Sequence, residues 1–282
     1  MAVGVKMIQW YPGHMAKTRK QVQENIKKVD IIYLLLDSRA PVSSLNPDIE
    51  SLVGNKPTLY IFNKSSLADL TTLKNVIKEE KYQDYVIIDA LKKTNLKHIR
   101  QKTLEMLAPI IQKKKSKGYQ KVSVKAMILG IPNVGKSTLI NAITNKKIAG
   151  TNAKPGFTKN LQWVFLDDDI HLLDTPGVLW PKFESLEVGY HLALSGAIKE
   201  TLLPNEKLAY YVYNFLMKYY PDRLKEHYHI EFDSAESFFS HLALKRGYLQ
   251  EQGSPNVEQS YLTLLDDLKK GLLGGVCFDR PI

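Results

Sequence analysis

The chain contains 282 residues, of which 44% are hydrophobic and 24% charged, and this composition is typical of a folded globular protein rather than a disordered one. Its longest uninterrupted apolar run, residues 31–36, is far too short to cross a bilayer, and the basic, polar N-terminus lacks the apolar core of a signal peptide. The single cysteine, Cys277, permits no internal disulfide and suits a reducing compartment. We therefore expect a cytoplasmic monomer that has no membrane partner.

Positive charge is in excess, with 39 Lys+Arg against 29 Asp+Glu and a formal net charge of +10. The excess is concentrated in two segments, because residues 1–28 carry six Lys or Arg against one acid, Glu24, and residues 113–125 carry six lysines and no acid. Such clusters are typical of nucleic-acid-binding surfaces, although a run of like charges is also found in solvated linkers. We favour a polyanionic partner such as RNA.

Hydrophobic periodicity predicts an α/β fold. A helix near the N-terminus places Val22, Ile26 and Val29 on one face. Six short apolar runs that fit buried parallel strands follow, at residues 31–36, 58–62, 85–88, 122–129, 161–166 and 170–173. Helical patterns at residues 67–80 and 96–112 lie between some of these runs, as the crossover helices of a parallel sheet do.

Beyond about residue 181 the pattern contains helices only. One helix is predicted at residues 210–220, a second opens with the capping pair Asp233 and Glu236, and a third opens at Ser254-Pro255. Glycines at 247 and 271 stand where the last two helices end.

These patterns divide the chain into two predicted domains. Residues 1–182, including the basic segment 1–29, form an α/β domain, and residues 183–282 form a small all-helical domain. The Lys-rich segment 113–121, which contains a glycine, is predicted to be an exposed connector inside the first domain.

Residues 130–137, Gly-Ile-Pro-Asn-Val-Gly-Lys-Ser, fit the phosphate-loop pattern G-x-x-x-x-G-K-[ST] between a predicted strand and a predicted helix. Small residues let backbone N–H groups surround a phosphate there, and the helix N-terminus adds positive potential. We expect Lys136 to reach the β- and γ-phosphate oxygens and Ser137 to ligate Mg²⁺. The expected nucleotide contacts of this segment are Asn133, Val134, Gly135, Lys136, Ser137 and Thr138.

The sequence Asp174-Thr-Pro-Gly177 ends the strand predicted at residues 170–173. By itself this tetrapeptide is more often a surface turn, but its place after a phosphate loop favours a nucleotide switch. We expect Asp174 to hold Mg²⁺ and the N–H of Gly177 to meet the γ-phosphate. Thr158 lies between the two motifs, and its hydroxyl is expected to complete the Mg²⁺ shell when a γ-phosphate is bound.

Residues expected to recognise a guanine base precede the phosphate loop, whereas in GTPases they normally follow it. Asn63-Lys64-Ser65-Ser66 follows one predicted strand and resembles the pattern Asn-Lys-x-Asp, and Asp89-Ala90 follows the next strand, where a backbone loop contacts guanine. The motif order is a circular permutation, which is physically allowed because the termini of a domain often lie close together. We expect the connector at residues 113–121 to be the segment that joins the original ends.

Together these motifs resemble those of the circularly permuted, YlqF-type GTPases over nearly the whole chain. The resemblance is carried by Trp10-Tyr-Pro-Gly-His14-Met15, Asp37-Ser-Arg39-Ala-Pro41, Ser43-Ser44-Leu45-Asn46-Pro47, Asn63-Lys64, residues 130–137 and Asp174-Thr-Pro-Gly-Val-Leu-Trp-Pro-Lys-Phe183. It implies a circularly permuted P-loop GTPase domain with a helical C-terminal domain, and GTP, GDP and Mg²⁺ as ligands. It also implies GTP hydrolysis coupled to late maturation of the large ribosomal subunit, with the helical domain docked on rRNA.

Ser66 departs from the family pattern, because a carboxylate at this position accepts hydrogen bonds from both N1–H and N2–H₂ of guanine. A hydroxyl accepts only part of that pair, and losing a charge-assisted hydrogen bond costs about 1.5–3 kcal/mol, or about ten- to a hundredfold in affinity. Asp69 lies three residues out of register and is not expected to substitute. We expect guanine preference to be weakened but retained in part by Asn63 and the loop at Ala90.

Val178 stands where Ras-like switches carry a water-positioning glutamine, and its side chain cannot hydrogen-bond a water. Asn133 matches an asparagine that helps hold K⁺ near the transferring phosphate in related GTPases, where a cation stabilises developing charge. His14, on a Pro-Gly turn, either orients the attacking water or faces RNA. The predicted catalytic set is His14, Asn133, Lys136, Thr158 and Gly177.

Three functions fit the sequence. The first is a GTPase that assists assembly of the large ribosomal subunit. The second is an RNA-binding scaffold that no longer turns nucleotide over usefully. Ser66 favours this function, and the intact set of Lys136, Ser137, Thr158 and Asp174 opposes it. The third is an ATPase or a relaxed nucleoside triphosphatase of the same fold.

Overall fold

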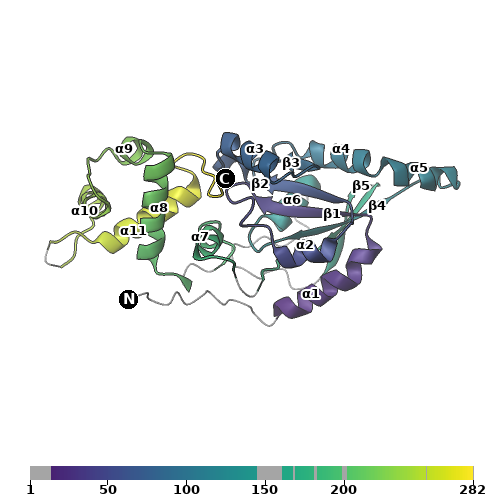
Figure 1. The fold of residues 1–282 in the computed structure, drawn as a ribbon, viewed down its shortest axis with the longest axis horizontal. Coiled ribbons are helices and arrows are strands. Elements are labelled where there is room, and N and C mark those ends of the chain that lie inside the picture. The colour runs from purple at the N-terminus through teal and green to yellow at the C-terminus, as the bar shows by residue number, and fades with distance from the viewer. Residues whose placement is uncertain are drawn as a thin grey trace.

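In the computed structural model a single sheet forms the centre of the larger part of the molecule (Figure 1). The model describes residues 14–144, 161–167, 169–180, 183–198, 202–251 and 253–281, with the backbone alone for residues 14–18, 166 and 167. The six strands of the sheet are β1 (Ile31–Asp37), β2 (Thr58–Asn63), β3 (Tyr85–Ile87), β4 (Val124–Gly130), β5 (Gln162–Asp167) and β6 (Ile170–Asp174). They lie side by side in the order β3-β2-β1-β4-β6-β5.

Five of these strands are parallel, as the continuous apolar runs predict, but β5 pairs antiparallel with β6. The prediction of a parallel strand at residues 161–166 is therefore wrong. The link between β5 and β6 is too short for a crossover helix, so the two strands form a hairpin. As the edge strand, β5 leaves Trp163 and Phe165 exposed.

The centre of the sheet is buried on both faces. All seven residues of β1 are buried, and they alternate between two hydrophobic clusters, with Ile31 and Leu35 on one side and Ile32 and Leu36 on the other. The second cluster also contains residues 22, 26 and 29 from the N-terminal helix and the turn after it, which confirms the predicted apolar face of that helix.

In the described part of the chain the sheet is accompanied by the α-helices α1 (His14–Asn25), α2 (Pro47–Val53), α3 (Leu70–Glu79), α4 (Lys97–Met106), α5 (Ala108–Ser116) and α6 (Lys136–Thr144). Two short 3₁₀ turns, η1 (Ile26–Lys28) and η2 (Ser65–Leu67), lie beside α1 and α3. The predicted helix at 96–112 is two helices that meet at Leu107, because Pro109 cannot donate the backbone hydrogen bond that a single helix requires. Since α5 continues to Ser116, the exposed connector is shorter than predicted.

The C-terminal part of the described chain is helical, as predicted, with α7 (Leu186–Leu194), α8 (Asn205–Tyr219), α9 (Arg223–Tyr228), α10 (Ala235–Arg246) and α11 (Val257–Lys270). Helices α8 to α11 form a bundle beside the sheet, and α7 lies between the bundle and the sheet (Figure 1). Within the described ranges every helix is too short or too polar to span a membrane.

Two predicted helix starts are wrong by one or two residues. Helix α10 is capped by Ser234, which exchanges hydrogen bonds with Ser237, rather than by the pair Asp233 and Glu236. Helix α11 is capped by Asn256 rather than started by Ser254-Pro255, because Pro255 pairs with Leu249 in a short β-bridge. The predicted ends are confirmed, since the glycines at 247 and 271 both adopt positive φ angles, +71° and +75°.

After α11 the chain returns to the sheet, and its C-terminal end lies between the bundle and β2 in Figure 1. Val276 N donates to Leu67 O at 3.1 Å and Phe278 N donates to Arg39 O at 2.6 Å. Asp279 then accepts hydrogen bonds from the backbone N–H groups of residues 42 and 43. The bundle is thus attached to the α/β part both by the segment before α7 and by the C-terminal segment.

Candidate nucleotide-binding site

The described segments that are predicted to bind nucleotide follow the carboxyl ends of strands in the sheet. β2 ends at Asn63, β4 at Gly130 and β6 at Asp174, and these three strands run parallel to β1. The register pairs Asp37 with Asn63 and Leu35 with Gly130. Ligands of open α/β sheets bind at the carboxyl ends of the strands, so motifs that are far apart in the sequence meet at the expected place.

The phosphate loop runs from the end of β4 into α6, and two of its glycines are required by close contacts. Gly130 has φ +154°, and a Cβ added to it would lie 2.5 Å from the carbonyl oxygen of Leu35. Gly135 has φ +104°, and its added Cβ would collide with Nδ2 of Asn63. Larger residues at either position would push the loop away from its neighbours, so the glycines set the shape of a phosphate cradle.

Lys136 lies inside this loop rather than in solvent. Its Nζ donates to the carbonyl oxygens of Gly130 and Ile131, both at 2.9 Å, and the residue is 7% exposed. Burial lowers the pKa of Lys136 to about 8, against the opposing effect of the Asp174 carboxylate. A cation desolvated in this way gains from an anionic ligand, as a phosphate-binding lysine does.

Asp174 is the described residue that best suits Mg²⁺. Its side chain is buried, and Oδ1 has no hydrogen-bond partner among the described residues. Burial raises the pKa of the Asp174 carboxyl, while the charge of Lys136 lowers it. A buried carboxylate oxygen without a partner is costly unless a cation or donor joins it, so the site fits a hard divalent ion.

The switch segment after Asp174 packs against the phosphate loop. Thr175 Oγ1 donates to Ile128 O at 2.6 Å, and a Cβ added to Gly177 would lie 2.7 Å from both Cα and N of Pro132. Val178 is 3% exposed in the core, so its side chain packs and does not face water. The Nδ2 of Asn46 donates to Val178 O at 3.0 Å and helps hold the segment in place.

Asn63 joins the phosphate loop to the predicted base loop. Its Nδ2 donates to Val134 O at 2.8 Å and its Oδ1 accepts from Ala90 N at 2.9 Å, while the side chain is 2% exposed. Asn63 and Ala90 therefore lie together, as their motifs predict, and the amide of Asn63 sets the spacing between the two loops.

Lys64 adopts a left-handed conformation, with φ +62°. It donates to Asp37 Oδ2 at 2.9 Å, and Arg39 binds both oxygens of the same carboxylate, at 3.0 and 2.8 Å. Burial by itself would raise the pKa of Asp37, but the two neighbouring cations hold it well below its usual range. Asp37, Arg39 and Lys64 thus form a buried charged cluster.

Sequence reasoning assigned no site role to this cluster beyond Lys64. Lys64 and Arg39 also approach the carbonyl oxygen of Ser195 at the end of α7, at 3.4 and 3.3 Å. Asn133, which has φ +56°, donates from Nδ2 to the next carbonyl, Gly196 O, at 2.8 Å. The only local signal is that Asp37 and Arg39 follow a buried strand, and nothing in the sequence indicates the turn after α7 as their partner.

Ser66 and Asp89 are in direct contact. The hydroxyl of Ser66 donates to Asp89 Oδ2 at 2.6 Å, and its backbone N–H donates to the same oxygen at 3.2 Å. Asp69 is engaged elsewhere, because its carboxylate caps α3 and accepts from the hydroxyl of Tyr220. Among predicted site residues, Thr158 and the side chain of His14 lie outside the described residues.

Known GTPases match the chain over most of its length. Residues 125–225 match the family model described as a 50S ribosome-binding GTPase. A "Ribosome biogenesis GTPase A" of Priestia megaterium is 40% identical over 279 residues, which are 97% of this chain and 97% of the relative. The chain belongs to the ribosome biogenesis GTPase A family. It is therefore a GTPase, and membership of this family implies that it binds GTP and GDP.

Further relatives of this GTPase agree with that assignment. A "Mitochondrial ribosome-associated GTPase 1" of Xenopus tropicalis is 33% identical over 303 residues, covering 97% of this chain and 95% of the relative. The crystal structure of GNP-bound YlqF from T. maritima has a TM-score of 0.63 at 23% identity and covers 94% of this chain and 98% of that chain. The shared fold is a circularly permuted P-loop GTPase domain followed by helices, as the order of motifs predicts.

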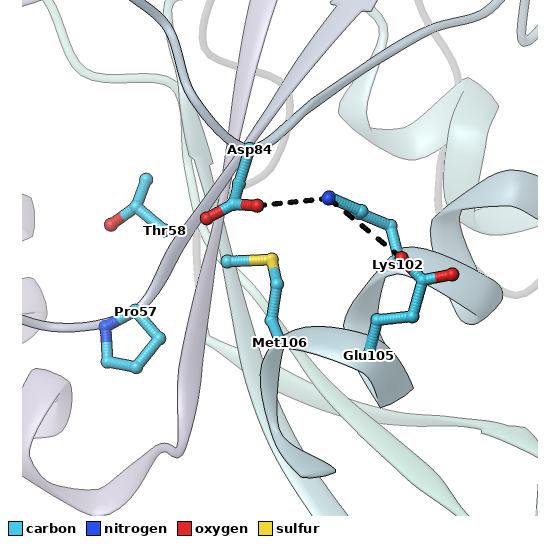
Figure 2. A pocket seen from close by; sticks show the side chains of 6 residues that line it. All are labelled: Pro57, Thr58, Asp84, Lys102, Glu105 and Met106. Carbon is cyan, nitrogen blue, oxygen red and sulfur yellow. Dashed lines mark ion pairs between the residues drawn. The ribbon is translucent and has the colours of Figure 1, made fainter.

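This GTPase also has a hollow of about 340 Å³ away from the nucleotide-binding ends of the strands. Figure 2 shows the ammonium of Lys102 between the carboxylates of Asp84 and Glu105, and the distance to Asp84 is 3.1 Å. Thr58, the first residue of β2, lines this hollow. The hollow therefore lies at the amino end of the strand, opposite the phosphate loop, and is not part of the nucleotide site.

Proposed function

We propose that this GTPase is a molecular switch that binds rRNA and assists late assembly of the large ribosomal subunit. The observation that carries the proposal is the joint between the nucleotide site and the turn after α7. There Arg39, Lys64 and Asn133 hold the carbonyl oxygens of Ser195 and Gly196. The relatives named after the ribosome support a ribosomal partner, and we further propose that the protein acts as a monomer in the cytoplasm.

The nucleotide contacts that we propose are those of the converging motifs. Lys136 binds the phosphates, and the buried, unpartnered oxygen of Asp174 supports its role as a ligand of Mg²⁺, together with Ser137 and Thr158. Bound Mg²⁺ stabilises the negative charge that develops on the phosphoryl oxygens. The remaining proposed contacts are Asn63, Lys64, Ser66, Asp89, Ala90, Asn133, Val134, Gly135, Thr138 and Gly177.

Asn133 and His14 are the two residues predicted to replace a catalytic glutamine, and the structure describes the side chain of Asn133. The core position of Val178 leaves no role for its side chain in orienting water, so another group supplies this function. Nδ2 of Asn133 donates to Gly196 O, and the amide also carries a carbonyl oxygen, the type of ligand that replaces the hydration shell of K⁺. We propose a K⁺ ligand at Asn133 and a water-orienting or RNA-facing role for His14.

The switch is connected directly to the helices. Gly177 touches the phosphate loop, and Trp180 and Phe183 follow within a few residues, both buried, with ring centroids 5.3 Å apart. Helix α7 begins at Leu186. Loss of the γ-phosphate therefore changes contacts in a segment that is packed against the start of the helical part, and no separate linker is needed.

The described end of the first basic cluster, at Lys27 and Lys28, lies close to the second cluster, and this supports an RNA partner. Asp30 N donates to Lys125 O at 2.6 Å, and Lys114 Nζ is 3.4 Å from Asp30 Oδ1. Lys27 and Lys28 lie just before Asp30 and are exposed. The two clusters thus meet at the amino ends of β1 and β4, and the phosphate loop lies at the opposite, carboxyl ends of the strands. A concentration of lysines of this kind favours a phosphate backbone.

Steady-state hydrolysis of GTP and of ATP, with and without large ribosomal subunits and in K⁺ or Na⁺, tests the proposed function. We expect turnover of GTP to be stimulated by the subunit and to depend on K⁺. Tight subunit binding without stimulation would instead favour the RNA-binding scaffold. Equal turnover of ATP and GTP would favour a relaxed nucleoside triphosphatase.

A further inference from the structure

Ser66 and Asp89 together supply a hydroxyl and a carboxylate beside the predicted base position. The carboxylate is at position 89 rather than at position 66, where the family pattern has it. Ser66 stands where the pattern Asn-Lys-x-Asp has its carboxylate, and Asp89 precedes Ala90, whose N–H is bound to Asn63. The side-chain oxygens of Ser66 and Asp89 are 2.6 Å apart, a short distance typical of a charge-assisted hydrogen bond. The missing carboxylate is therefore present beside its expected position, supplied by the loop after β3.

The surroundings of Asp89 keep this carboxylate charged. Burial by itself would raise its pKa, but hydrogen bonds from Ser66 and from the backbone N–H of Lys92 hold the pKa below the ordinary value. Asp89 is 3% exposed whereas Ser66 is exposed, so the carboxylate lies beneath the hydroxyl. The hydroxyl of Ser66 thus lies between the negative charge of Asp89 and the surface.

The hydrogen bond fixes the direction of the hydroxyl. A serine hydroxyl has one proton and two acceptor lone pairs, and an ionised carboxylate can only accept. The proton of Ser66 therefore points to Asp89, and the lone pairs of its Oγ are left for other donors. Ser66 in this state presents an acceptor with negative charge behind it.

We propose that Ser66 and Asp89 act as a pair that recognises guanine, with Ser66 accepting from the N1–H and N2–H₂ edge of the base and Asp89 positioning the hydroxyl. This inference rests on the GTPase function and names the residues that give it base specificity. Adenine presents a lone pair at N1, and xanthine presents an oxygen where guanine has its amino group. Adenine and xanthine therefore each place an acceptor atom against the acceptor Oγ of Ser66. Ser66 considered alone predicts a weakened preference for guanine. With Asp89 behind its hydroxyl, we expect the preference to be retained.

Equilibrium titration with fluorescent GDP, ADP and XDP tests the pair in the Asp89→Asn variant. Asparagine keeps the size of the side chain but can donate to Ser66, which frees the hydroxyl to donate to a base. We expect the preference for GDP over ADP and over XDP to fall about ten- to a hundredfold, while the affinity for ADP does not fall. An equal loss of affinity for all three nucleotides, or an unchanged preference, would overturn the proposal.

A second variant and a control keep the test independent of folding. The exchange Ser66→Asp with Asp89→Ser returns the carboxylate to the family position, and we expect it to recover most of the GDP preference. If it recovers none, the pair is not the determinant. Asp69→Asn, the nearest alternative carboxylate in sequence, is expected to leave the preference unchanged, and a lost preference there would assign the role to Asp69 instead.

These titrations use diphosphates without ribosomes, so they do not depend on stimulated hydrolysis. Failure of the unmodified protein to bind any of the nucleotides would contradict its function as a GTPase. An unchanged preference in Asp89→Asn would contradict only the role of the Ser66–Asp89 pair.

Discussion

Asn133 in the phosphate loop donates a hydrogen bond from Nδ2 to the carbonyl oxygen of Gly196, which is 2.8 Å away and 63 residues later in the sequence. Gly196 follows α7, and the preceding carbonyl, that of Ser195, is approached by Arg39 and Lys64. The turn after α7 is thus held by side chains that follow β1, β2 and β4. A change in the phosphate loop has a direct route to the helical part through this turn.

Replacing Asn133 by alanine is expected to loosen that turn. A neutral hydrogen bond contributes about 0.5–1.5 kcal/mol, so backbone amides at the end of α7 should exchange with solvent about two- to tenfold faster. If Asn133 also binds K⁺, stimulated GTP turnover should become equal in K⁺ and Na⁺. Asn25→Ala removes a comparable hydrogen bond within α1 and should change neither measurement. Unaltered exchange at α7 would show that the contact is not used in solution.

Gly177→Ala is expected to separate the binding of triphosphate from that of diphosphate. The new Cβ would lie 2.7 Å from the backbone of Pro132, so either the switch or the phosphate loop must move. Losing a hydrogen bond from Gly177 N–H to the γ-phosphate should lower the affinity for a non-hydrolysable GTP analogue about ten- to a hundredfold more than that for GDP. Gly118→Ala, in the exposed connector, meets no atom within 4 Å and should leave both affinities unchanged. Equal losses for both nucleotides would argue against the γ-phosphate contact.

Asp37→Asn is expected to be among the most destabilising single changes at the nucleotide edge. The substitution leaves Arg39 and Lys64 buried without their counter-charge, and breaking a buried pair in this way costs about 3–5 kcal/mol. The exposed pair between Asp266 and Lys270 is a matched control, and Asp266→Asn should change the stability far less because solvent screens this pair. Urea unfolding of both variants measures the difference, and similar costs would mean that the cluster adds little.

Asp279→Asn is expected to destabilise the protein in a pH-dependent way. Asp279 Oδ1 accepts from Ser43 Oγ at 2.5 Å and lies 3.1 Å from His191 Nδ1. Burial by itself would raise the pKa of Asp279, but these partners hold it below the ordinary value. Because the folded pKa is below the unfolded one, the stabilisation is present above about pH 4 and is lost as the pH falls through the folded pKa.

The measurement is urea unfolding of the wild type and of Asp279→Asn at several pH values. Near pH 7 we expect the variant to be less stable by about 1–3 kcal/mol, because the backbone and side-chain donors around residue 279 lose a charged acceptor. As the pH falls below about 4 the difference should shrink, and it should disappear once the pH is below the lowered folded pKa of Asp279. A difference that does not vary with pH would mean that the charge of Asp279 is not what stabilises the C-terminal segment.

Reversing charge where the basic clusters meet is expected to weaken binding to rRNA. Lys27→Glu with Lys28→Glu places two carboxylates beside residues 113–125, and binding to an rRNA fragment should become weaker and less dependent on salt concentration. Lys74→Glu with Lys78→Glu makes the same change in charge on the exposed side of α3, outside both clusters. The two double variants should differ in affinity at low salt. Equal losses would indicate an effect of net charge alone.

Much of the fold follows from local pattern. β1 is buried along its whole length, so its apolar run identifies a central strand of a parallel sheet. The direction of β5 was predicted wrongly because a six-residue apolar strand has the same composition in either direction. The caps of α10 and α11 depend on the loops before them, where Ser237 and the bridge at Pro255 compete with the side chains that pattern alone would choose.

By itself the sequence determined the phosphate loop, the switch and their permuted order, because each is a contiguous strand–loop segment whose chemistry is local. Only the tertiary structure decided that Lys64 binds Asp37, that Asn133 binds Gly196 and that Asp89 lies against Ser66. The strand order β3-β2-β1-β4 places the end of β2 beside the ends of β1 and β3, and this brings Lys64 to Asp37 and Asp89 to Ser66. The contact between Asn133 and Gly196 depends instead on how the turn after α7 packs against the loop after β4. A buried carboxylate and its donor must be within about 3 Å to offset desolvation, and that distance is set by the packing of the whole sheet.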